Sequence, residues 1–324
     1  MQAWHPSKGD LKRYPHFDNF LPTSEIEAIV KDSERVRTNA FFPFLRYTKS
    51  WQPFRSGDVP RKRKERPIRY ASRRDAYIFS YYRHLLSEKY DVALDVLGIS
   101  DNVIAYRKIA VDLEIQRGKC NIDFAKDAFD AVLELGDCCA VALDISSYFE
   151  SIDHVNLRRV WCRLLEVENL PPDHAQVFKA ITQYAVVDRN SVYERLGYFG
   201  RKPHGGNCFL KPFHDMPMQL CTTKDFREKI CGGLPEYPSL IEKNDRPYGI
   251  PQGAPISDLL ANAYLIDFDC QMAAYVRERG GYYYRYSDDM LLLVPGGEME
   301  GKAARQYAVS TIKKFLITHH SPPV

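Results

Sequence analysis

The sequence lacks several features that would exclude an ordinary soluble fold. No apolar run approaches the roughly 18 residues that a membrane-spanning helix needs. No secretory leader is recognisable, because residues 1–10 are polar and mixed in charge. The 8 cysteines include no Cys-x-x-Cys pair, so no disulfide framework is indicated. We therefore expect a soluble, cytoplasmic protein with reduced thiols and no membrane partner.

Strong overall charge and a recognisable zinc motif are also missing. The net charge is only +3 and the pI is about 8.3, so any affinity for nucleic acid must come from local patches. One group of residues has the right chemistry for zinc, but its spacings match no common site, and zinc is not expected. These residues are His204, Cys208, His214, Cys221 and Cys231.

Two adjacent carboxylates, Asp288 and Asp289, follow the strand-forming run Tyr282–Tyr286 and precede the apolar residues 290–294. Both flanks favour β-structure, so the sequence predicts a β-hairpin with the acids at its tip. Like charges at a tight turn repel one another, whereas divalent cations favour carboxylate oxygens. An acidic turn alone is common, and the interpretation therefore needs a third acid on another strand.

Asp144 supplies that third acid. It ends the short apolar run 138–143, which predicts a buried strand. A single Asp at a strand end is often only a cap, but here Phe149 and the sequence Ile152-Asp153-His154 follow it. This arrangement resembles the first catalytic block of the reverse transcriptase palm.

A glycine-containing block, residues 249–257, reads Gly-Ile-Pro-Gln-Gly-Ala-Pro-Ile-Ser and precedes a helical run. Gly253 lets the backbone approach a ligand closely, and Pro255 suits the first turn of a helix. The block resembles the Pro-Gln-Gly motif of group II intron-like and other prokaryotic reverse transcriptases. Without its neighbours it would be an ordinary turn before a core helix. The order Asp144, Gln252, Asp288 favours the polymerase interpretation.

A basic run, Arg61 to Tyr70, lies upstream and leads into Ile68 to Tyr82, a segment with a helical pattern. Such runs are usually solvated faces. Its Arg66-Pro67-Ile68 resembles the fingers block that holds the incoming triphosphate. The segments 70–90 and 105–108 resemble the fingers of phage-defence reverse transcriptases of the abortive-infection and unknown groups. The candidates for nucleotide binding are Arg66, Lys64 and Arg69, and those for nucleic-acid binding are Arg61, Arg63, Arg73 and Arg74.

The resemblance implies an α+β right-hand polymerase in which an antiparallel palm sheet with a catalytic hairpin packs on helices. We expect an N-terminal extension (1–60), fingers (61–135), a first palm part (136–187), an insertion or fingers–palm connection (188–248) and a second palm part (249–324). Helices are expected over 24–36, with Thr23 or Ser24 as cap, and over 124–135, 155–165, 255–278 and 302–318, with one opened by Pro171-Pro172. The primer-grip hairpin and helical thumb that follow the palm in this family are missing from the sequence, which indicates a truncated gene, a fragment or a partner protein that supplies the rest.

The implied reaction is DNA synthesis from dNTPs on an RNA template, with a DNA or RNA primer, in bacterial anti-phage defence. Two Mg²⁺ ions are the expected cofactors, with Mn²⁺ as a substitute. Asp144 and Asp288 with the Ile145 carbonyl would bind them, and Asp289 would complete the catalytic acids. Gln252 would position the nucleotide, and Phe149 would exclude a 2′-hydroxyl. A non-coding RNA is a further expected partner.

Two alternatives remain at this stage. The first is a palm polymerase that makes RNA or adds nucleotides without a template, which nucleotide choice and template dependence would reveal. The second is a catalytically silent RNA-binding subunit of a defence complex. The complete set of acids argues against silence, because converging carboxylates repel one another unless a cation is bound.

Overall fold

The computed structural model describes residues 4–52, 63–111, 117–201, 205–210, 212 and 215–316. It is a mixed α+β fold that divides into two compact units. Unit 1 comprises Met1–His84, Leu170–Arg246 and Ile250–Ser257, and unit 2 comprises Leu85–Asn169, Pro247–Gly249 and Asp258–Val324. The units are therefore discontinuous in sequence and cut across the five segments expected above.

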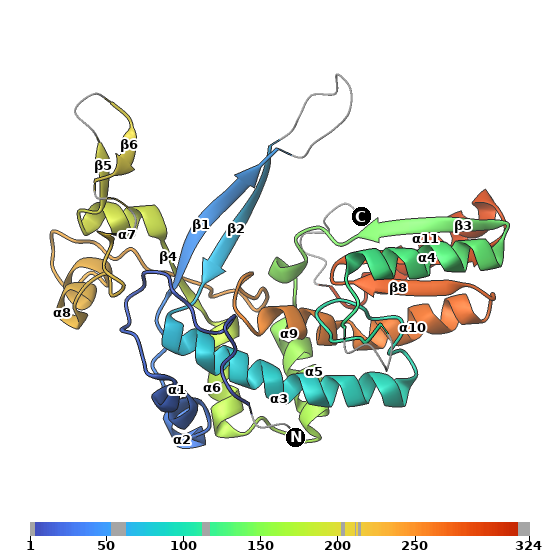
Figure 1. Ribbon diagram of the computed structural model, residues 1–324, viewed down its shortest axis with the longest axis horizontal. Coiled ribbons are helices and arrows are strands. Elements are labelled where there is room, and N and C mark those ends of the chain that lie inside the picture. The colour runs from blue at the N-terminus through green and yellow to red at the C-terminus, as the bar shows by residue number, and fades with distance from the viewer. Residues whose placement is uncertain are drawn as a thin grey trace. The chain divides into compact units, whose positions relative to one another are not determined.

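Unit 1 is built on a four-stranded sheet of order β2-β1-β4-β7. The strands are β1 (Phe44–Trp51), β2 (Lys64–Tyr70), β4 (Ala185–Asp188) and β7 (Glu242–Lys243). Strand β1 runs antiparallel to β2 and parallel to β4, and β1 and β2 form a long ribbon (Figure 1). The remaining elements are α1 (Thr23–Val30), α2 (Ser33–Arg37), the start of α3 (Arg73–Leu97), α6 (Pro172–Thr182), α7 (Arg189–Arg195), the pair β5 (Phe199–Arg201) and β6 (Asn207–Phe209), and α8 (Thr223–Asp225) with a π-helical turn Phe226–Ile230.

The core of unit 1 joins segments that lie far apart in the sequence. Phe17 and Leu45 from the N-terminal part pack in one buried cluster with Val192, Leu220 and Ile230. Residues expected to form an N-terminal extension and an insertion thus share one hydrophobic core, because the parallel pairing of β1 with β4 brings them together.

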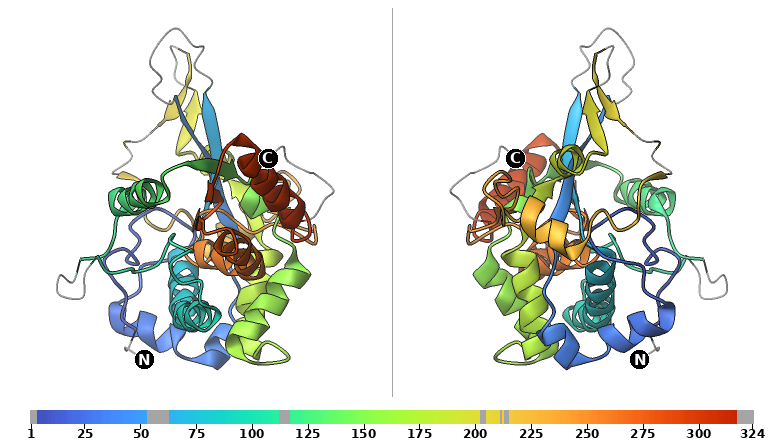
Figure 2. Two further views of the ribbon diagram at one scale, coloured as in Figure 1. Left: turned by 90° about the vertical axis from the view of Figure 1, so that its right-hand side faces the viewer. Right: turned by 90° about the vertical axis from the view of Figure 1, so that its left-hand side faces the viewer.

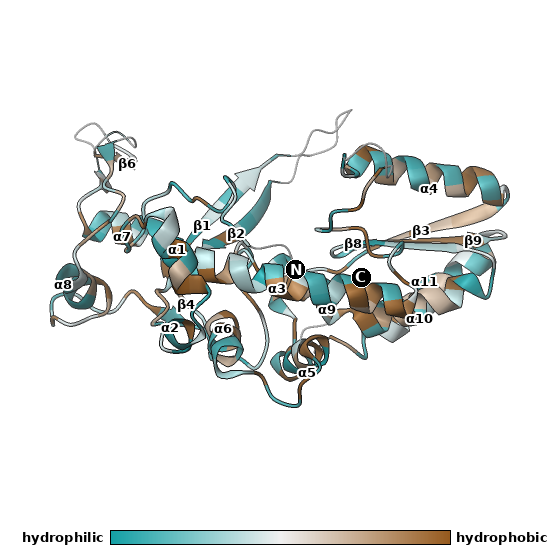
Figure 3. Cartoon of the chain, turned by 60° about the horizontal axis from the view of Figure 1, so that its bottom comes forward, coloured by the Kyte–Doolittle hydropathy of each residue, from teal (hydrophilic) through white to brown (hydrophobic). Residues whose placement is uncertain are grey.

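Unit 2 contains the antiparallel three-stranded sheet β3-β9-β8. Its elements are α4 (Asn121–Leu135), β3 (Cys138–Asp144), the short 3₁₀ helix η1 (Tyr148–Glu150), α5 (His154–Leu165), most of α9 (Ser257–Tyr264), α10 (Ile266–Arg277), β8 (Tyr282–Tyr286), β9 (Asp289–Pro295) and α11 (Glu298–Ile312). Helices α10 and α11 pack on one face of the sheet and α4 lies over the other (Figures 2 and 3). One face is therefore sealed, and the other is only partly covered.

Several predicted elements are confirmed. The hairpin predicted around Asp288 and Asp289 forms as β8 and β9, helix α4 ends at Gly136, and α5 covers the apolar positions expected of it. Trp161 of α5 is buried in the core. Pro172 begins α6, where its missing N–H is harmless.

Other predicted elements differ in their bounds. The helix expected over 24–36 is two helices, because Asp32 accepts hydrogen bonds from Glu34 and Arg35 and caps a new one; neither Thr23 nor Ser24 caps the first, which follows Pro22. The helix expected over 255–278 breaks at Leu265 into α9 and α10. The helix expected over 302–318 begins four residues earlier and ends at Ile312.

Two strand assignments also need correction. Residues 68–70, expected to be helical, belong to β2. Strand β3 was expected to be buried, but within it only Val141 is, because β3 is an edge strand of the sheet. The apolar run thus reflects one packed face against α11 rather than burial on both sides. Among the helices formed by the described residues, none is both long and apolar enough to cross a bilayer.

Candidate functional site

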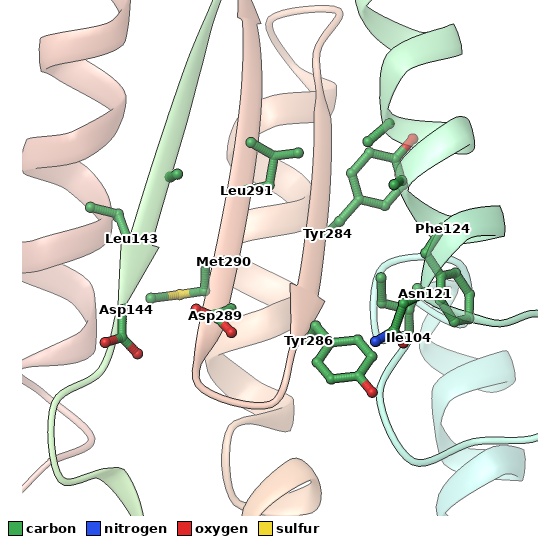
Figure 4. Close-up of a pocket in the computed structure, with 13 residues that line it drawn as sticks. Ile104, Asn121, Phe124, Leu143, Asp144, Tyr284, Tyr286, Asp289, Met290 and Leu291 are labelled. Carbon is green, nitrogen blue, oxygen red and sulfur yellow. The ribbon is translucent and has the colours of Figure 1, made fainter. Parts of the chain in front are cut away.

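The acidic hairpin tip in unit 2 is fixed by strand register. Asp289 is the first residue of β9 and pairs with Tyr286 of β8 on one side and with Asp144 of β3 on the other. Directly opposed residues in antiparallel strands project from the same face, and Figure 4 shows these two carboxylates on neighbouring strands. Both carboxylates are exposed. The structure therefore places Asp144 beside Asp289.

Asp288 lies in the turn between β8 and β9, next to Ser287, which has φ 60°. Its backbone carbonyl accepts a hydrogen bond of 3.1 Å from the N–H of Ile145, the residue after Asp144. Ile145 itself is buried. The chain after β3 is thus fastened to the turn, and the predicted ligands Asp144, Ile145 and Asp288 belong to one local structure.

The chemistry of these donors suits a hard divalent cation. Within the described part of the chain, no three His, Cys, Asp or Glu side chains are already gathered as a metal site. Mg²⁺ is commonly held by one or two carboxylates together with substrate phosphates rather than by a closed protein cage. An exposed pair, Asp144 and Asp289, with Asp288 adjacent, matches that mode of binding.

A buried arginine, which the sequence interpretation missed, lies beneath the hairpin tip. Arg285 and Asp269 are fully buried and form a bidentate ion pair with distances of 2.7 and 2.6 Å. Tyr283 donates to the same carboxylate at 2.8 Å, and Asn262 accepts from the guanidinium through its side chain and its carbonyl. Burial and strand alternation place Arg285 on the face opposite to Asp144 and Asp289.

Tyr106 is a second residue that sequence reasoning did not select. It has φ 59°, an uncommon conformation for a non-glycine residue, and its ring lies 6.1 Å from that of Tyr286. Burial raises the pKa of its hydroxyl, a hydrogen bond with Ser287 lowers it, and the carboxylates of Asp258 and Asp288 raise it. Tyr106 therefore belongs to the surroundings of the acidic turn. Its left-handed backbone cannot be read from sequence.

Phe149, the predicted sugar gate, lies on η1 and is half-buried. Its neighbour Tyr148 is only 2% exposed and donates a 2.5 Å hydrogen bond to the carbonyl of Ala261. Burial raises the pKa of Tyr148 well above its usual value. Tyr148, rather than Phe149, is the aromatic anchor of this segment, which leaves part of the Phe149 ring accessible.

The sequence Ile152-Asp153-His154 has a structural role. Asp153 caps α5 by accepting from Asn156 at 2.7 Å, and the His154 ring nitrogen Nε2 lies 2.8 Å from the carbonyl of Gly249. Burial lowers the pKa of His154, and the contact with Gly249 raises it. These residues fasten the segment Pro247–Gly249 to unit 2.

A cleft of about 650 Å³ opens on the acidic face of the sheet, between the sheet and α4. Asp144, Asp289 and Tyr286 lie at one end of it, and Tyr284 and Phe124 line its interior (Figure 4). The acids are therefore at the mouth of a largely apolar cleft.

In unit 1 the predicted phosphate-binding residues are divided between two faces of the β1–β2 ribbon. Lys64 and Arg66 pair with Trp51 and Lys49, so these four exposed side chains share one face, and the Arg66 guanidinium lies 5.7 Å from the Trp51 ring centroid. Arg69 pairs with Arg46 on the opposite face. The structure thus groups Lys64 with Arg66 and separates both from Arg69.

Arg73 was expected to bind nucleic acid, and this prediction is wrong. It is fully buried, and its guanidinium donates to the carbonyls of Tyr14 and Met218, at 2.8 and 3.0 Å, and to that of Asp18. Because its donors hold three backbone carbonyls, it ties core segments together and presents no charge to a ligand.

The other basic candidates have different surroundings. Arg74 is half-buried, with its backbone N–H bonded to Asp18. Arg63 is exposed and donates to the Ser50 hydroxyl at 2.5 Å. Arg61 lies outside the described residues.

The Pro-Gln-Gly turn packs against β2. The Gln252 carbonyl accepts a 2.9 Å hydrogen bond from the N–H of Arg69. Gly253 has φ 114°, and a Cβ at this position would lie 2.6 Å from the Arg69 carbonyl oxygen. Glycine is thus required here for an approach to the protein's own backbone, whereas the sequence interpretation assigned that freedom to ligand binding.

The cysteines give no support for zinc among the described residues. Cys208, Cys221 and Cys231 are half-buried free thiols, and no group of three metal-binding side chains occurs in the part of the chain that is described. Burial and the Asp225 carboxylate raise the pKa of Cys221 to about 11, which disfavours the thiolate that zinc needs. His204 and His214 lie outside the described residues.

Comparisons with protein-family models and with curated proteins find no match. Among solved structures, the chain is similar to apo telomerase from Candida tropicalis truncated from its C-terminal domain, with 10% identity, a TM-score of 0.46 and coverage of 79% of this chain and 46% of that one. It is also similar to telomerase from Candida albicans in complex with a TWJ fragment of telomeric RNA, with 11% identity, a TM-score of 0.44 and coverage of 89% and 45%. The chain spans less than half the length of each.

Proposed function

We propose that the protein is an RNA-directed DNA polymerase that extends a primer by metal-assisted nucleotidyl transfer. The observation that supports this most strongly is the register that sets Asp144 beside Asp289 at one end of the sheet, with Asp288 in the adjoining turn. The order of the motifs in the sequence, with Asp144 first, Gln252 second and Asp288 third, supports the same function. Carboxylates on adjoining residues repel one another, and a bound divalent cation would offset that repulsion.

Each side chain has a defined part in this proposal. Asp144, Asp288 and Asp289, with the Ile145 carbonyl, would hold Mg²⁺, which supplies charge neutralisation for the triphosphate and activation of the primer hydroxyl. Lys64 and Arg66 would bind nucleotide phosphates, since both are exposed cations on one strand face. Gln252 would position the nucleotide, and Phe149 would contact the sugar and exclude a 2′-hydroxyl.

The biological setting that we propose is bacterial anti-phage defence, acting on an RNA template that a non-coding RNA or partner protein helps to present. This part rests on the similarity of the 70–90 and 105–108 segments to defence-associated fingers. Sequencing nucleic acid that copurifies with the protein tests it. Copies of a discrete RNA would support it, and a random mixture of host fragments would contradict it.

The enzymatic proposal is tested with Asp288→Asn, which removes an anionic ligand at nearly constant volume. We expect Mg²⁺-dependent dNTP incorporation on an RNA template to fall at least 100-fold, about 2.7 kcal/mol in the barrier, while RNA binding changes little. Asp267→Asn is the matched control, because Asp267 is an acid of the same unit that pairs with Arg159 and Arg163 at the surface.

Template and nucleotide are varied in the same assay. Asp288→Asn activity within tenfold of the parent would contradict the metal assignment. Synthesis from NTPs, or without any template, would favour the rival polymerase activities instead.

A further inference from the structure

The ion pair beneath the hairpin tip is unusual because every donor of its arginine is engaged. The Arg285 guanidinium makes five hydrogen bonds: two to Asp269, one to each of the Asn262 side-chain and backbone oxygens, and one of 2.9 Å from Nη1 to the carbonyl of Ser287. A guanidinium has five N–H donors, so this group is fully satisfied. Four of the bonds anchor it to α9 and α10, and the fifth reaches the turn.

Stability alone does not account for this pair. Burying two charges costs desolvation that their attraction offsets only in part, and well-packed apolar residues at such positions are often equally stable. The ion pair therefore needs a role besides stability, and that role lies in the group that it holds in place. The Ser287 carbonyl is the one partner in the network that belongs to the acidic turn.

The bond to Ser287 acts on a strained turn. Ser287 has φ 60°, a left-handed conformation that is unfavourable for a non-glycine residue. A hydrogen bond from a charged donor is stronger than one between neutral groups, so it can offset the cost of this conformation. The carbonyl of Asp288 is also bonded, to the Ile145 N–H at 3.1 Å. Hydrogen bonds therefore fix two consecutive backbone carbonyls of the turn, that of Ser287 and that of Asp288.

We propose that Arg285 is a positioning residue that sets the backbone of Asp288 for metal binding, an inference that rests on the proposed function. Asp269 orients the guanidinium, Asn262 locks it against α9, and Nη1 holds the Ser287 carbonyl. Without the guanidinium, the peptide between Ser287 and Asp288 can rotate, and the Asp288 carboxylate no longer keeps one position relative to Asp144 and Asp289.

The test uses the full chain and Mn²⁺ alone as the probe, with binding measured by electron paramagnetic resonance and stability by thermal unfolding. The main variant is the double exchange Arg285→Met with Asp269→Leu, which replaces the ion pair by apolar side chains of similar size. We expect Mn²⁺ to bind 10–100-fold more weakly, the range seen when an outer partner of a metal ligand is lost. We also expect kcat to fall by a similar factor with little change in the KM for dNTP.

Two further variants separate positioning from folding. Tyr283→Phe removes a bond to the same buried carboxylate without touching the turn, so it is expected to lower Tm and to leave Mn²⁺ affinity unchanged. Arg285→Lys keeps a charge facing Asp269, but a single ammonium lacks the fork that reaches Asp269, Asn262 and Ser287 together. Its Mn²⁺ affinity is expected to fall as well, and it serves if the double variant does not fold.

The outcomes distinguish this inference from the proposed function. If Asp288→Asn weakens Mn²⁺ binding but the Arg285 variants bind Mn²⁺ as the parent does, the positioning role is overturned and the polymerase proposal stands. If Asp288→Asn itself leaves Mn²⁺ binding unchanged, the metal assignment is wrong and the positioning role is overturned with it. Equal weakening in Tyr283→Phe would show that the effect is one of general stability.

Discussion

Two carboxylates of unit 2 that lie far apart in the sequence share one exposed environment, whereas three arginines of unit 1 that lie close together in the sequence have three different environments. In unit 2, Asp144 and Asp289 come from distant parts of the chain and meet through strand register. In unit 1, three arginines within seven positions of one another separate: Arg66 is on an exposed strand face, Arg69 is on the opposite face, and Arg73 is in the core. Strand register therefore predicts which residues share a site better than their proximity in the sequence does.

The physical reason is the period of the backbone. Side chains alternate faces along a strand, so Lys64 and Arg66 share a face and Arg69 does not. After Tyr70 the strand ends and a helix begins at Arg73, which changes the period. A basic run can thus contribute to a ligand site only through those members that the local period brings to one face.

The largest effects that test this comparison are expected at Arg66 and Arg73. Arg66→Ala should raise the KM for dNTP at least tenfold, because a charge-assisted bond to phosphate is worth about 1.5–3 kcal/mol. Its Tm should change little, since the side chain is exposed. Arg73→Met should instead lower the free energy of unfolding by about 3 kcal/mol, because three core carbonyls lose their donor. Steady-state kinetics and urea unfolding measure the two quantities separately.

Arg69→Ala is the control that separates the effect of the strand face from the effect of losing a positive charge. It removes the same group three residues away, on the other side of the ribbon. A KM for dNTP that is unchanged in Arg66→Ala but raised in Arg69→Ala would reverse the assignment of the ligand-binding face.

The sequence predicts the hairpin and its neighbours well because each rests on a strong local pattern. The aromatic run Tyr282–Tyr286 and the apolar run after Asp289 fix two strands, and the acids between them fix the turn. Helices α4 and α5 follow from apolar spacing, and Gly136 marks where α4 ends. These elements required no knowledge of distant contacts.

What the sequence does not predict depends on tertiary partners. Arg285 lies in a tyrosine-rich run and becomes a buried cation only because α10 offers Asp269. The exposure of β3 depends on its place at the sheet edge, which its apolar composition does not reveal. Gly253 requires its conformation because of the carbonyl of Arg69, a residue about 180 positions away in the sequence.

An effect of intermediate size on nucleotide choice is expected in unit 2, where Phe149 and its neighbour Tyr148 have different roles. Phe149→Val should raise the use of NTP relative to dNTP about tenfold, or about 1.4 kcal/mol, because it opens space for a 2′-hydroxyl. Tyr148→Phe is the matched control: it removes the buried bond to Ala261 and should lower Tm without changing the preference between sugars. Single-nucleotide incorporation with both substrates gives the ratio.

A different result at Phe149 would change the interpretation of the proposed activity. If dNTP and NTP incorporation fall equally and Tm drops, Phe149 is a packing residue whose loss leaves a cavity. RNA synthesis would then be a stronger candidate for the activity.

The smallest effects on stability are expected from buried titratable groups in the core of unit 1. Burial, with the Arg73 charge, lowers the pKa of His16 to about 3, and its Nδ1 accepts from the Phe17 N–H at 2.8 Å. Burial raises the pKa of Asp75 to about 6, opposed by hydrogen bonds from Phe42, Ser72 and Asn39. The two groups therefore have opposite effects on stability below neutral pH.

The signs follow from proton binding. Between about pH 3 and 6.5 the unfolded chain binds a proton at His16 that the folded chain does not, so stability falls as the pH is lowered through this window. Between about pH 3.8 and 6 the folded chain binds a proton at Asp75 that the unfolded chain does not, so this group adds stability as the pH is lowered. Each slope is at most about 1.4 kcal/mol per pH unit, and the two largely cancel in the parent between pH 4 and 6.

Removing one group at a time should expose the other. His16→Gln should become more stable on going from pH 6 to pH 5 by about 1 kcal/mol, whereas Asp75→Asn should lose about as much over the same interval. Urea unfolding at several pH values, with the parent as control, measures both slopes. A slope that does not change in His16→Gln would mean that His16 is as readily protonated in the folded chain as in the unfolded one. His16 would then be no buried core group, which would contradict a purely structural role for the buried titratable groups of unit 1.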